Sequence, residues 1–203
     1  MANISFMISV LIPVHNYLIT PLVQSLHKQL TAEKIAFEII CLDDASTDRK
    51  FTKINKKICE LEGVKYNLLK TNIGRSAIRN KLAKIAQYEW LLFLDADVLP
   101  KSELFVRNYL DAIDSNSEVT VGGLDYVNEE PESDNYLRWK YGRKREIKSK
   151  EQRQLRPYIN LLGCNFFIQK KIFNTIQWKR RHNPKIFLKI RNYFPKYHDK
   201  LDE

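Results

Sequence analysis

The stretch "WLLFLDADVLP", Trp90–Pro100, decides the fold of this chain. Its first five residues are all apolar, and a short run of this kind predicts a strand that is covered on both faces. Asp95 and Asp97 follow at the point where that strand must end. Two carboxylates one residue apart at the end of a buried strand predict a site that needs negatively charged oxygen ligands.

Strand and helix patterns alternate with short connections through the first 125 residues. The expected strands are residues 5–14, 37–44, 64–69, 90–94 and 118–126. Repeated units of this length predict an α/β fold with a mostly parallel sheet and helices on both faces. Thr20 is expected to cap the first helix. The second helix is expected to carry apolar residues from Phe51 to Leu61, and the third a core stripe of Ile78, Leu82 and Ile85.

The pattern changes after residue 127. Residues 128–156 have no clear period and are expected to form a mobile loop or a helix on the surface. Residues 158–173, "YINLLGCNFFIQKKIF", predict a strand that leads into a helix, and residues 178–203 form a basic tail without a core of their own.

Charge is distributed unevenly along the 203 residues. The net charge of +10 divides into −4 for residues 1–137 (15 Lys+Arg, 19 Asp+Glu), +7 for residues 138–156 (9 and 2) and +7 for residues 170–203 (10 and 3). The basic character therefore belongs to two late segments, and no motif accompanies it that would predict nucleic-acid binding. The tail, in which basic and apolar residues alternate, leaves open a peripheral contact with an anionic membrane or a solvated end.

Three further features bound the class of protein. The 44% hydrophobic content allows one substantial core. Cys41, Cys59 and Cys164 are far apart in sequence, which favours reduced residues in or near the core over a disulfide or zinc set. No run of eighteen apolar residues occurs and the N-terminus lacks the features of a signal peptide, so the cytoplasm is the expected compartment.

Polar clusters follow four of the expected strands: Pro13–Asn16, Asp43–Asp48, Thr71–Asn80 and Asp95–Asp97. Because ligands of an open parallel sheet bind beyond the carboxyl ends of its strands, these clusters are expected to meet in one crevice. Each has a simpler interpretation as well. Thr47 or Asp48 is a candidate helix cap, Asn72 and Gly74 suit an ordinary turn, and Arg75 with Arg79 suits a solvated helix face.

The combination favours a metal site that binds phosphate. Mg²⁺ or Mn²⁺ takes oxygen ligands and commonly bridges one or two carboxylates to the phosphates of a substrate. Asp95 and Asp97 are the candidate ligands, and Arg75 and Arg79 are candidates to contact the same phosphates.

The ordered set "SVLIPVHN", "CLDDASTD", "NIGRSAIRN" and "FLDADVLP" resembles the nucleotide-sugar-binding half of family 2 glycosyltransferases, which have the GT-A fold. The match covers about residues 5–125, and "LLGCNFFIQKKIF" resembles the acceptor-side strand and helix of that family. The resemblance implies a metal-dependent transfer of a hexose-like sugar from a UDP-sugar-like donor to a hydroxyl of a glycan or a lipid-linked acceptor. It divides the chain into a donor half (1–127), an acceptor-side segment (128–177) and the tail (178–203).

The resemblance also implies roles for single residues. Asp44 would contact the base of the nucleotide, Asp95 would lie near the ribose and the metal, and Asp97 would be the main metal ligand. The other residues that would line the donor pocket are Pro13, His15, Asn16, Asn72, Arg75 and Arg79. Gly163, Cys164 and Asn165 would lie beside the acceptor.

Two departures from the family pattern accompany the resemblance. Ala45 stands where glycine is usual. The family also places an acidic pair, which includes the general base, 10 to 25 residues beyond "KKIFNTI", but the corresponding window here has no carboxylate before Asp199. His198, Asp199, Asp202 and Glu203 are poor substitutes at a chain end, so the catalytic base is unassigned.

Other functions fit the sequence less well. Phosphatases of the haloacid dehalogenase type place an Asp-x-Asp motif after their first strand, whereas three strand-helix units precede it here. A sugar nucleotidylyltransferase would need a glycine-rich loop early in the chain, and "IPVHNYLITP" has no glycine. A donor-binding remnant that is truncated or altered at its end, and so lacks the base, remains the alternative to a working enzyme.

Overall fold

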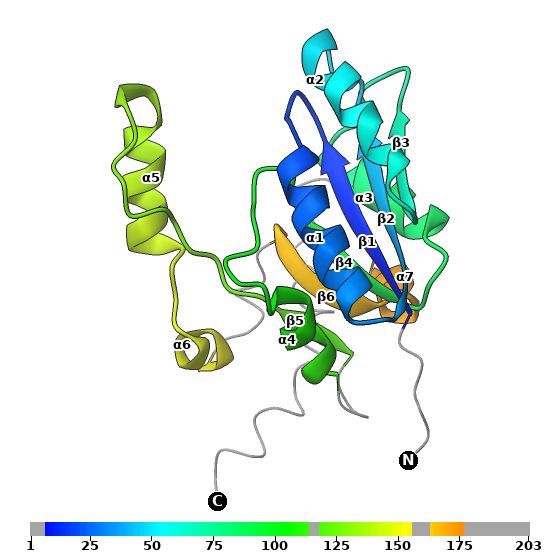
Figure 1. Cartoon of the computed structure of the whole chain (residues 1–203). Coiled ribbons are helices and arrows are strands. Elements are labelled where there is room, and N and C mark those ends of the chain that lie inside the picture. Colours follow the sequence, from blue (N-terminus) through cyan, green and yellow to red (C-terminus); the bar gives the residue numbers. More distant parts are fainter. Residues whose placement is uncertain (1–6, 114–117, 156–162, 177–203) are drawn as a thin grey trace, which may run out of the picture.

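The computed structural model describes residues 7–113, 118–155 and 163–176 of the chain. Within them, six strands form one sheet and helices lie on both of its faces (Figure 1). The strands are β1 Met7–Val14, β2 Ala36–Asp43, β3 Val64–Leu68, β4 Trp90–Leu94, β5 Val119–Val121 and β6 Asn165–Gln169. The helices are α1 Thr20–Ala32, α2 Arg49–Asn55, the 3₁₀ helix η1 Lys56–Glu60, α3 Arg75–Ile85, α4 Phe105–Asp111, α5 Ser133–Arg145, α6 Lys150–Leu155 and α7 Lys170–Ile176.

The sheet is mostly parallel, as predicted. Its strand order is β3-β2-β1-β4-β6-β5. Strands β3, β2, β1 and β4 are parallel neighbours, whereas β6 lies antiparallel to both β4 and β5. The chain moves outward from β1 to β3 and then returns to place β4 on the other side of β1. The sheet therefore has a topological switch point between β1 and β4, and ligands of open parallel sheets bind at such a point, beyond the carboxyl ends of the strands.

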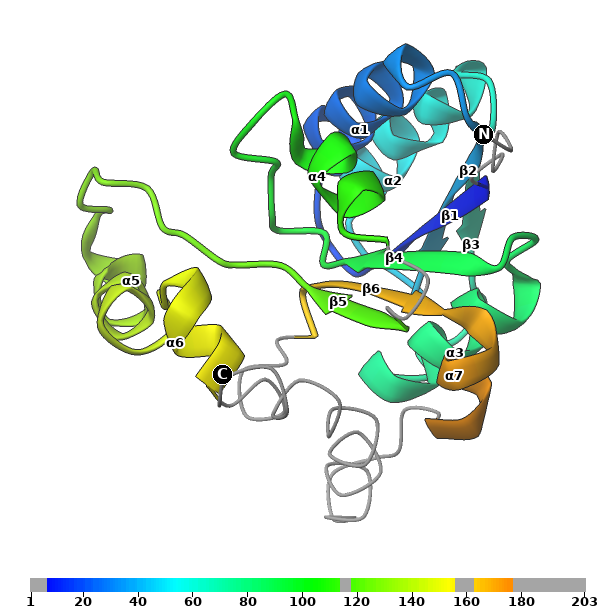
Figure 2. The same ribbon diagram turned by 90° about the horizontal axis from the view of Figure 1, so that it is seen from below.

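Alternating residues of the strands fill two cores, one on each face of the sheet. Val10 and Ile12 of β1 belong to the core beneath α1 and α4, whereas Leu11 belongs to the core beneath α3 and α7. Figure 2 shows α1, α2 and α4 on one face and α3 and α7 on the other. The apolar run of β4 follows from this arrangement, because Leu92 and Phe93 are both fully buried but face opposite cores.

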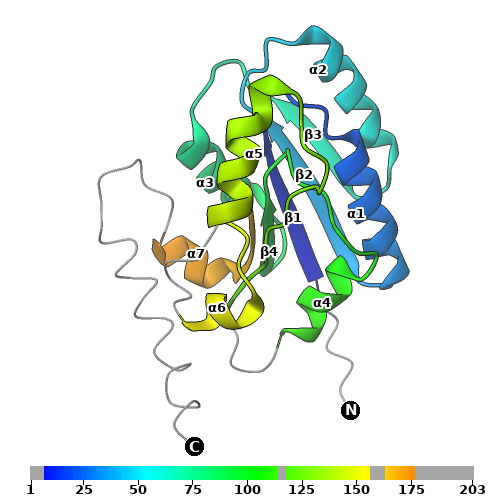
Figure 3. The same cartoon turned by 90° about the vertical axis from the view of Figure 1, so that its left-hand side faces the viewer.

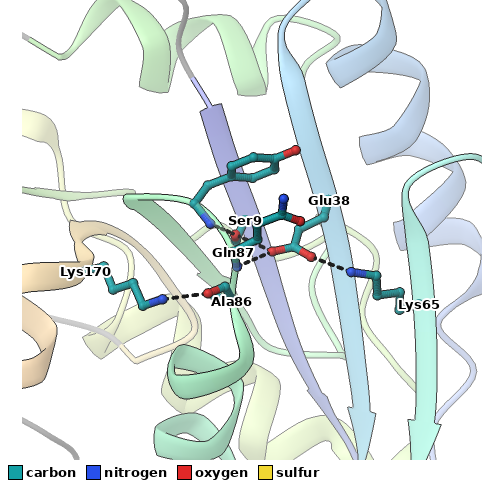
Figure 4. A network of polar contacts seen from close by, with 7 residues as sticks. Ser9, Glu38, Lys65, Ala86, Gln87 and Lys170 are labelled. Carbon is teal, nitrogen blue, oxygen red and sulfur yellow. Dashed lines mark hydrogen bonds and ion pairs between the residues drawn. The ribbon is translucent and has the colours of Figure 1, made fainter.

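A buried polar cluster fixes the amino ends of the strands (Figure 4). Glu38 of β2 is 3% exposed, and its carboxylate accepts hydrogen bonds from the Ser9 hydroxyl (2.7 Å) and the Gln87 backbone N–H (2.6 Å). Lys65 of β3 forms an ion pair with the same carboxylate at 2.9 Å. Burial opposes ionisation, but these donors outweigh it and lower the pKa of Glu38. The cluster therefore joins β1, β2, β3 and the turn before β4 at the amino ends of the strands.

Helix α1 begins differently from the prediction. Thr20 is its first residue and not its cap, and Ile19 at the cap position makes no side-chain capping hydrogen bond. Asn55 of α2 holds this turn, because its side chain accepts from the Ile19 N–H (3.1 Å) and donates to the Tyr17 carbonyl (2.8 Å). Asn55 also ends α2 early, and the chain continues as η1 instead of the single helix that the apolar positions predicted.

Other expectations about the body need correction. Ile85 of α3 is 44% exposed, and Ala83 takes the buried place in the last turn. Cys41 is buried as expected, but Cys59 is exposed. The strand expected at residues 118–126 contains only the three residues of β5, which pairs with β6 at the edge of the sheet. For residues 128–156, by contrast, the expected surface helix is confirmed, because this segment contains α5 and α6.

The structure also bears on the membrane question. In the described parts of the chain, every helix is too short or too polar to span a bilayer. The basic tail at residues 178–203 lies outside the described residues.

Candidate functional site

The predicted polar clusters meet at the carboxyl ends of the parallel strands. His15 and Asn16 follow β1, Asp44 follows β2, and Asp95 and Asp97 follow β4. Pro13 lies near the end of β1, in register with Leu42 of β2. The loop from Thr71 to Gly74 between β3 and α3 reaches the same place through its contacts with Asp44.

Asp44 joins three of these segments. It is 5% exposed, and its carboxylate accepts hydrogen bonds from the backbone N–H groups of Ile73 (2.7 Å) and Gly74 (2.9 Å). Its carbonyl oxygen accepts from the His15 ring (3.1 Å) and from the Asn72 side chain (3.1 Å). Each carboxylate oxygen has a second lone pair, so a further donor can still bind. Asp44 therefore holds together the loops that follow β1, β2 and β3.

Asn16 holds the loop after β2. Its side-chain oxygen accepts from the backbone N–H groups of Thr47 (2.8 Å) and Asp48 (3.0 Å), and its own N–H donates to the Ser46 hydroxyl (2.7 Å). Its φ of +48° lies in the left-handed region, which asparagine tolerates better than most residues. Asp48 is the N-cap of α2 and accepts from the Phe51 N–H at 3.0 Å. The simpler interpretation of Asp48, as a helix cap, is thus confirmed.

Asp43, which sequence reasoning did not single out, is fully buried and also shapes the site. Its carboxylate accepts from the Ser46 N–H (2.7 Å) and from the Tyr66 hydroxyl. The sequence marks this residue by the pair of aspartates at the end of β2, of which only Asp44 was predicted to belong to the site.

Arg79 is buried, although its spacing from Arg75 was compatible with a solvated helix face. It is 8% exposed, and its guanidinium donates to the Asp95 carboxylate and, at 3.0 Å, to the Arg75 carbonyl. Arg75 itself is exposed. Burial and the neighbouring Asp97 carboxylate raise the pKa of Asp95, and the Arg79 guanidinium opposes them. The arginine therefore stabilises one carboxylate of the pair.

Asp97, unlike Asp95, is exposed and has no arginine partner among the described residues. Within residues 7–113, 118–155 and 163–176, its carboxylate makes no hydrogen bond and no ion pair. The same residues contain no group of three or more His, Cys, Asp and Glu side chains that could enclose a metal. Mg²⁺ and Mn²⁺ do not need one, because they are commonly held by one or two carboxylates together with substrate phosphates and water. Asp97 and the Asp95 oxygen that does not face Arg79 fit such an ion.

The acceptor-side segment lies against these carboxylates. Strand β6 pairs with β4 so that Asn165 is opposite Leu94, and the Asp95 N–H donates to the Cys164 carbonyl at 3.1 Å. Gly163 directly precedes them. Burial raises the pKa of the Cys164 thiol to about 11, and the Asp95 and Asp97 charges contribute. The backbone therefore brings Cys164 beside Asp95, and the contact of Gly163 and Cys164 with an acceptor stays a prediction.

Asn165 is buried, and its side chain bonds within the fold. Its oxygen accepts from the Tyr109 hydroxyl of α4 (2.5 Å), and its amide donates to the Gly123 carbonyl (3.0 Å). Gly122 lies so close that a Cβ there would be 2.2 Å from the Asn165 amide nitrogen. Asn165 thus joins α4, β6 and the segment after β5, and its contact with an acceptor stays a prediction.

A protein-family model described as "Glycosyl transferase family 2" matches residues 9–177. The chain belongs to glycosyl transferase family 2. The match includes every residue proposed above for the donor, metal and acceptor sides. The family's expected general base falls beyond it, in residues that the structure does not describe.

Curated relatives in this family are longer proteins. The poly(ribitol-phosphate) beta-glucosyltransferase of Bacillus spizizenii is 38% identical over 124 residues, which are 60% of this chain and 19% of that protein. The chain therefore spans about a fifth of the length of this relative.

Solved structures support the GT-A fold expected from the motifs. TarS residues 1–349 from Staphylococcus aureus, in complex with UDP-GlcNAc, superposes with a TM-score of 0.63 at 23% identity, covering 91% of this chain and 53% of that one. The glucosyl-3-phosphoglycerate synthase of Mycobacterium tuberculosis, in complex with Mn²⁺, UDP and glucosyl-3-phosphoglycerate, superposes with a TM-score of 0.52 at 15% identity over 84% of this chain and 59% of that one. At these identities the likeness concerns the fold.

Proposed function

We propose that this family 2 chain binds a UDP-sugar-like donor at the carboxyl ends of β1, β2 and β4 and transfers its sugar to an acceptor hydroxyl. One observation carries the proposal: the exposed Asp97 carboxylate lies at the switch point, close in sequence to Asp95, whose carboxylate is bonded to Arg79. The neighbouring loops are joined there by Asp44. The solved relative with UDP-GlcNAc and the one with UDP and Mn²⁺ support the same class of donor.

The donor would lie across the loops that Asp44 holds together. Pro13, His15 and Asn72 would border the base, and the exposed Arg75 would supply a cation to the diphosphate. Mg²⁺ or Mn²⁺ bound by Asp97 and Asp95 would supply positive charge to the departing nucleotide diphosphate. Arg79 would keep Asp95 ionised and oriented while the donor binds.

The acceptor side would be the region around Gly163 and Cys164, which borders the Asp95–Asp97 pair. The resemblance to family 2 implies a glycan or a lipid-linked hydroxyl as the acceptor, and the named relatives narrow this range. Two of them are named as glycosyltransferases of poly(ribitol-phosphate), so a polyol-phosphate polymer is the acceptor class to test first.

A second candidate function is donor binding without efficient transfer. The sequence has no carboxylate from Lys170 to His198. Among the described carboxylates, Glu146 is bound by Arg138 (2.9 and 3.1 Å) and by the Tyr126 hydroxyl. Burial opposes ionisation of Glu146, yet these bonds lower its pKa, which makes it a weak base.

Transfer is tested separately from binding. The purified chain is incubated with UDP-GlcNAc or UDP-glucose, Mn²⁺ and poly(ribitol phosphate), and both UDP release and sugar on the polymer are measured. Multiple turnovers that Asp97→Asn abolishes and Asp111→Asn leaves unchanged would support the enzyme; Asp111 is an exposed carboxylate on α4. Donor binding without product would favour the second candidate.

The place of action belongs to the proposal as well. We expect the chain to act in the cytoplasm, with residues 178–203 as the candidate for a peripheral contact with an anionic membrane. Sedimentation with phosphatidylglycerol vesicles, at low and high salt, tests that contact.

A further inference from the structure

Helix α5 contributes none of its described apolar side chains to the hydrophobic core. Of its residues whose side chains are described, only Gly142 is buried, whereas Leu137 is 77% and Tyr141 is 59% exposed. Figure 1 shows α5 standing clear of the sheet, and Figure 3 shows it on the side of the carboxyl ends of the parallel strands. A helix of 13 residues is marginally stable by itself in water, so its order depends on local contacts.

Those contacts attach α5 to residues 125–127, which lie between β5 and α5 in the chain. The Trp139 ring N–H donates to the Val127 carbonyl at 2.8 Å, and Arg143 donates to the same oxygen at 3.1 Å. Gly142 lies against Tyr126, where a Cβ would be 2.1 Å from the ring. Asp125, just before Tyr126, forms an ion pair with Lys101 in the loop that follows Asp97.

One side of α5 carries a row of cations and aromatic rings, which we call the cationic stripe: Tyr136, Trp139, Lys140, Arg143 and Lys144. The two lysines are exposed, and the other three residues are half-buried. The Lys140 ammonium lies 5.3 Å from the centre of the Tyr136 ring, and the Arg143 guanidinium 5.0 Å from that of Trp139. These positions recur at three and four residues, so they form one surface of the helix. Stacking orients both cations. Nη1 of Arg143 is already bonded to the Val127 carbonyl and the Asn128 side chain. The Lys140 ammonium and the Nη2 side of Arg143 are therefore the groups offered to an anion.

Charge along this part of the chain is polarised. Residues 125–134 carry five acidic and no basic side chains, and residues 135–145 carry five basic and no acidic ones. The acidic part restricts an anionic partner to the second half of α5. That half is the end nearer the site, because the chain runs from it into α6, where Arg153 would lie 2.8 Å from a Cβ at Gly123. The Gly123 carbonyl in turn accepts from Asn165, next to Cys164.

The composition of the stripe distinguishes between anionic partners. A helix that lies in a membrane interface separates its basic and apolar faces, but here the cations lie on the aromatic rings. Proteins that bind single-stranded nucleic acid offer open ring faces for bases, and here two rings are covered by cations. Phosphates spaced by hydrophilic polyol units fit best, since the cations would bind the phosphates and the ring edges would contact the carbon chain.

We propose that the cationic stripe of α5 binds a phosphodiester-linked polyol polymer and leads it toward Cys164 and the Asp95–Asp97 pair. This inference rests on the proposed function, because it assigns the acceptor a binding surface in the same protein. The acceptor would then enter the site from the side of the molecule that carries α5.

The test compares two double variants of the full chain. The stripe variant carries Lys140→Gln and Arg143→Gln, and the control carries Lys53→Gln and Lys57→Gln, which remove the same charge from exposed positions in α2 and η1. Binding of poly(ribitol phosphate), of neutral dextran and of UDP with Mn²⁺ is measured by calorimetry, and circular dichroism confirms the fold of each variant.

We expect the stripe variant to bind the polymer about tenfold or more weakly, since two charge-assisted contacts are lost, and to bind UDP like the wild type. The control should change the affinity for the polymer less than about twofold, and Lys140→Arg with Arg143→Lys should retain most of the binding.

Equal affinity of the stripe and control variants for the polymer would overturn the proposal, as would absence of polymer binding in a wild type that binds UDP. Tighter binding of phosphatidylglycerol vesicles or of a single-stranded oligonucleotide than of the polymer would overturn it in favour of that partner. Stripe-dependent self-association without polymer binding would assign the stripe to a second copy of the chain. Failure of UDP to bind would instead count against the proposed function, and the polymer measurements would still decide the role of α5.

Discussion

Replacing Ala45 by glycine should make the protein more stable. Ala45 follows Asp44 in the loop after β2 and has a φ of +58°, in the left-handed region. A Cβ costs about 1–2 kcal/mol in that conformation, because it approaches the following carbonyl oxygen. Glycine does not have this strain, but its unfolded chain is more flexible, which offsets about 0.4–1 kcal/mol.

With about 1.5 and about 0.7 kcal/mol as the middle of these two ranges, the net gain in the free energy of unfolding is about 0.8 kcal/mol. For a chain of 203 residues, this corresponds to a rise of the melting temperature of about 1–4 °C. Urea denaturation and calorimetry of Ala45→Gly measure both quantities. UDP affinity should stay the same or improve, since the substitution favours the loop conformation that holds Asp44 in place.

Ala77→Gly is the matched control, because Ala77 is exposed on α3 and has ordinary helical geometry. It should lower the free energy of unfolding by about 0.5–1 kcal/mol. If Ala45→Gly destabilises the protein as much as Ala77→Gly does, the left-handed conformation at residue 45 is wrong, and with it the reasoning about this loop.

Three further substitutions test other parts of the structure. Because hydrogen bonds lower the pKa of Glu38, its stabilising effect is present above its ordinary value of 4.5 and is lost as the pH falls through the lower folded value. The stability difference between wild type and Glu38→Gln should therefore shrink as the pH falls below 4.5 in denaturation curves, and a constant difference would contradict the mechanism. Arg79→Leu leaves Asp95 without its partner and should cost about 2–3 kcal/mol in urea denaturation, less than a fully buried pair, and a loss below about 0.5 kcal/mol would refute the ion pair's importance. Asn165→Ala removes two buried hydrogen bonds, including that from Tyr109, and should cost about 2–3 kcal/mol while UDP affinity persists in calorimetry; lost UDP affinity in a folded variant would show a direct role in the site.

The sheet and the location of the site could be predicted because their signals are local. The apolar run of β4 indicates burial on both faces wherever the strand is placed, and Asp95 and Asp97 mark its end. The parallel order then brings the other strand ends beside them. These inferences depend on residue type and spacing within a few positions.

The details of the site depend on partners that local patterns do not reveal. Helical spacing put Arg79 on the same face as Arg75, but its burial is determined by Asp95, which lies 16 positions away on another element. The partners of the Asp44 carboxylate are backbone N–H groups of Ile73 and Gly74, and backbone groups leave no signature in a sequence.

Long-range pairing and polar helices are similarly hard to predict. The insertion of β6 between β4 and β5 is a tertiary pairing that residues 118–126 do not specify. Helix α5 has no apolar stripe facing a core, so periodicity could not identify it, and its stacked cations and rings became visible only in the structure. The division at residues 127 and 177 into donor half, acceptor-side segment and tail stays a prediction.

The measurement that tests the central claim most directly is calorimetric titration of UDP into the purified chain, with and without Mn²⁺, repeated on Asp97→Ala and on Asp111→Ala as its control. We predict metal-dependent binding that Asp97→Ala loses and Asp111→Ala keeps. Binding that is indifferent to Mn²⁺ and to Asp97 would contradict the metal site, and absence of binding for UDP, GDP and TDP alike would contradict the donor site as a whole.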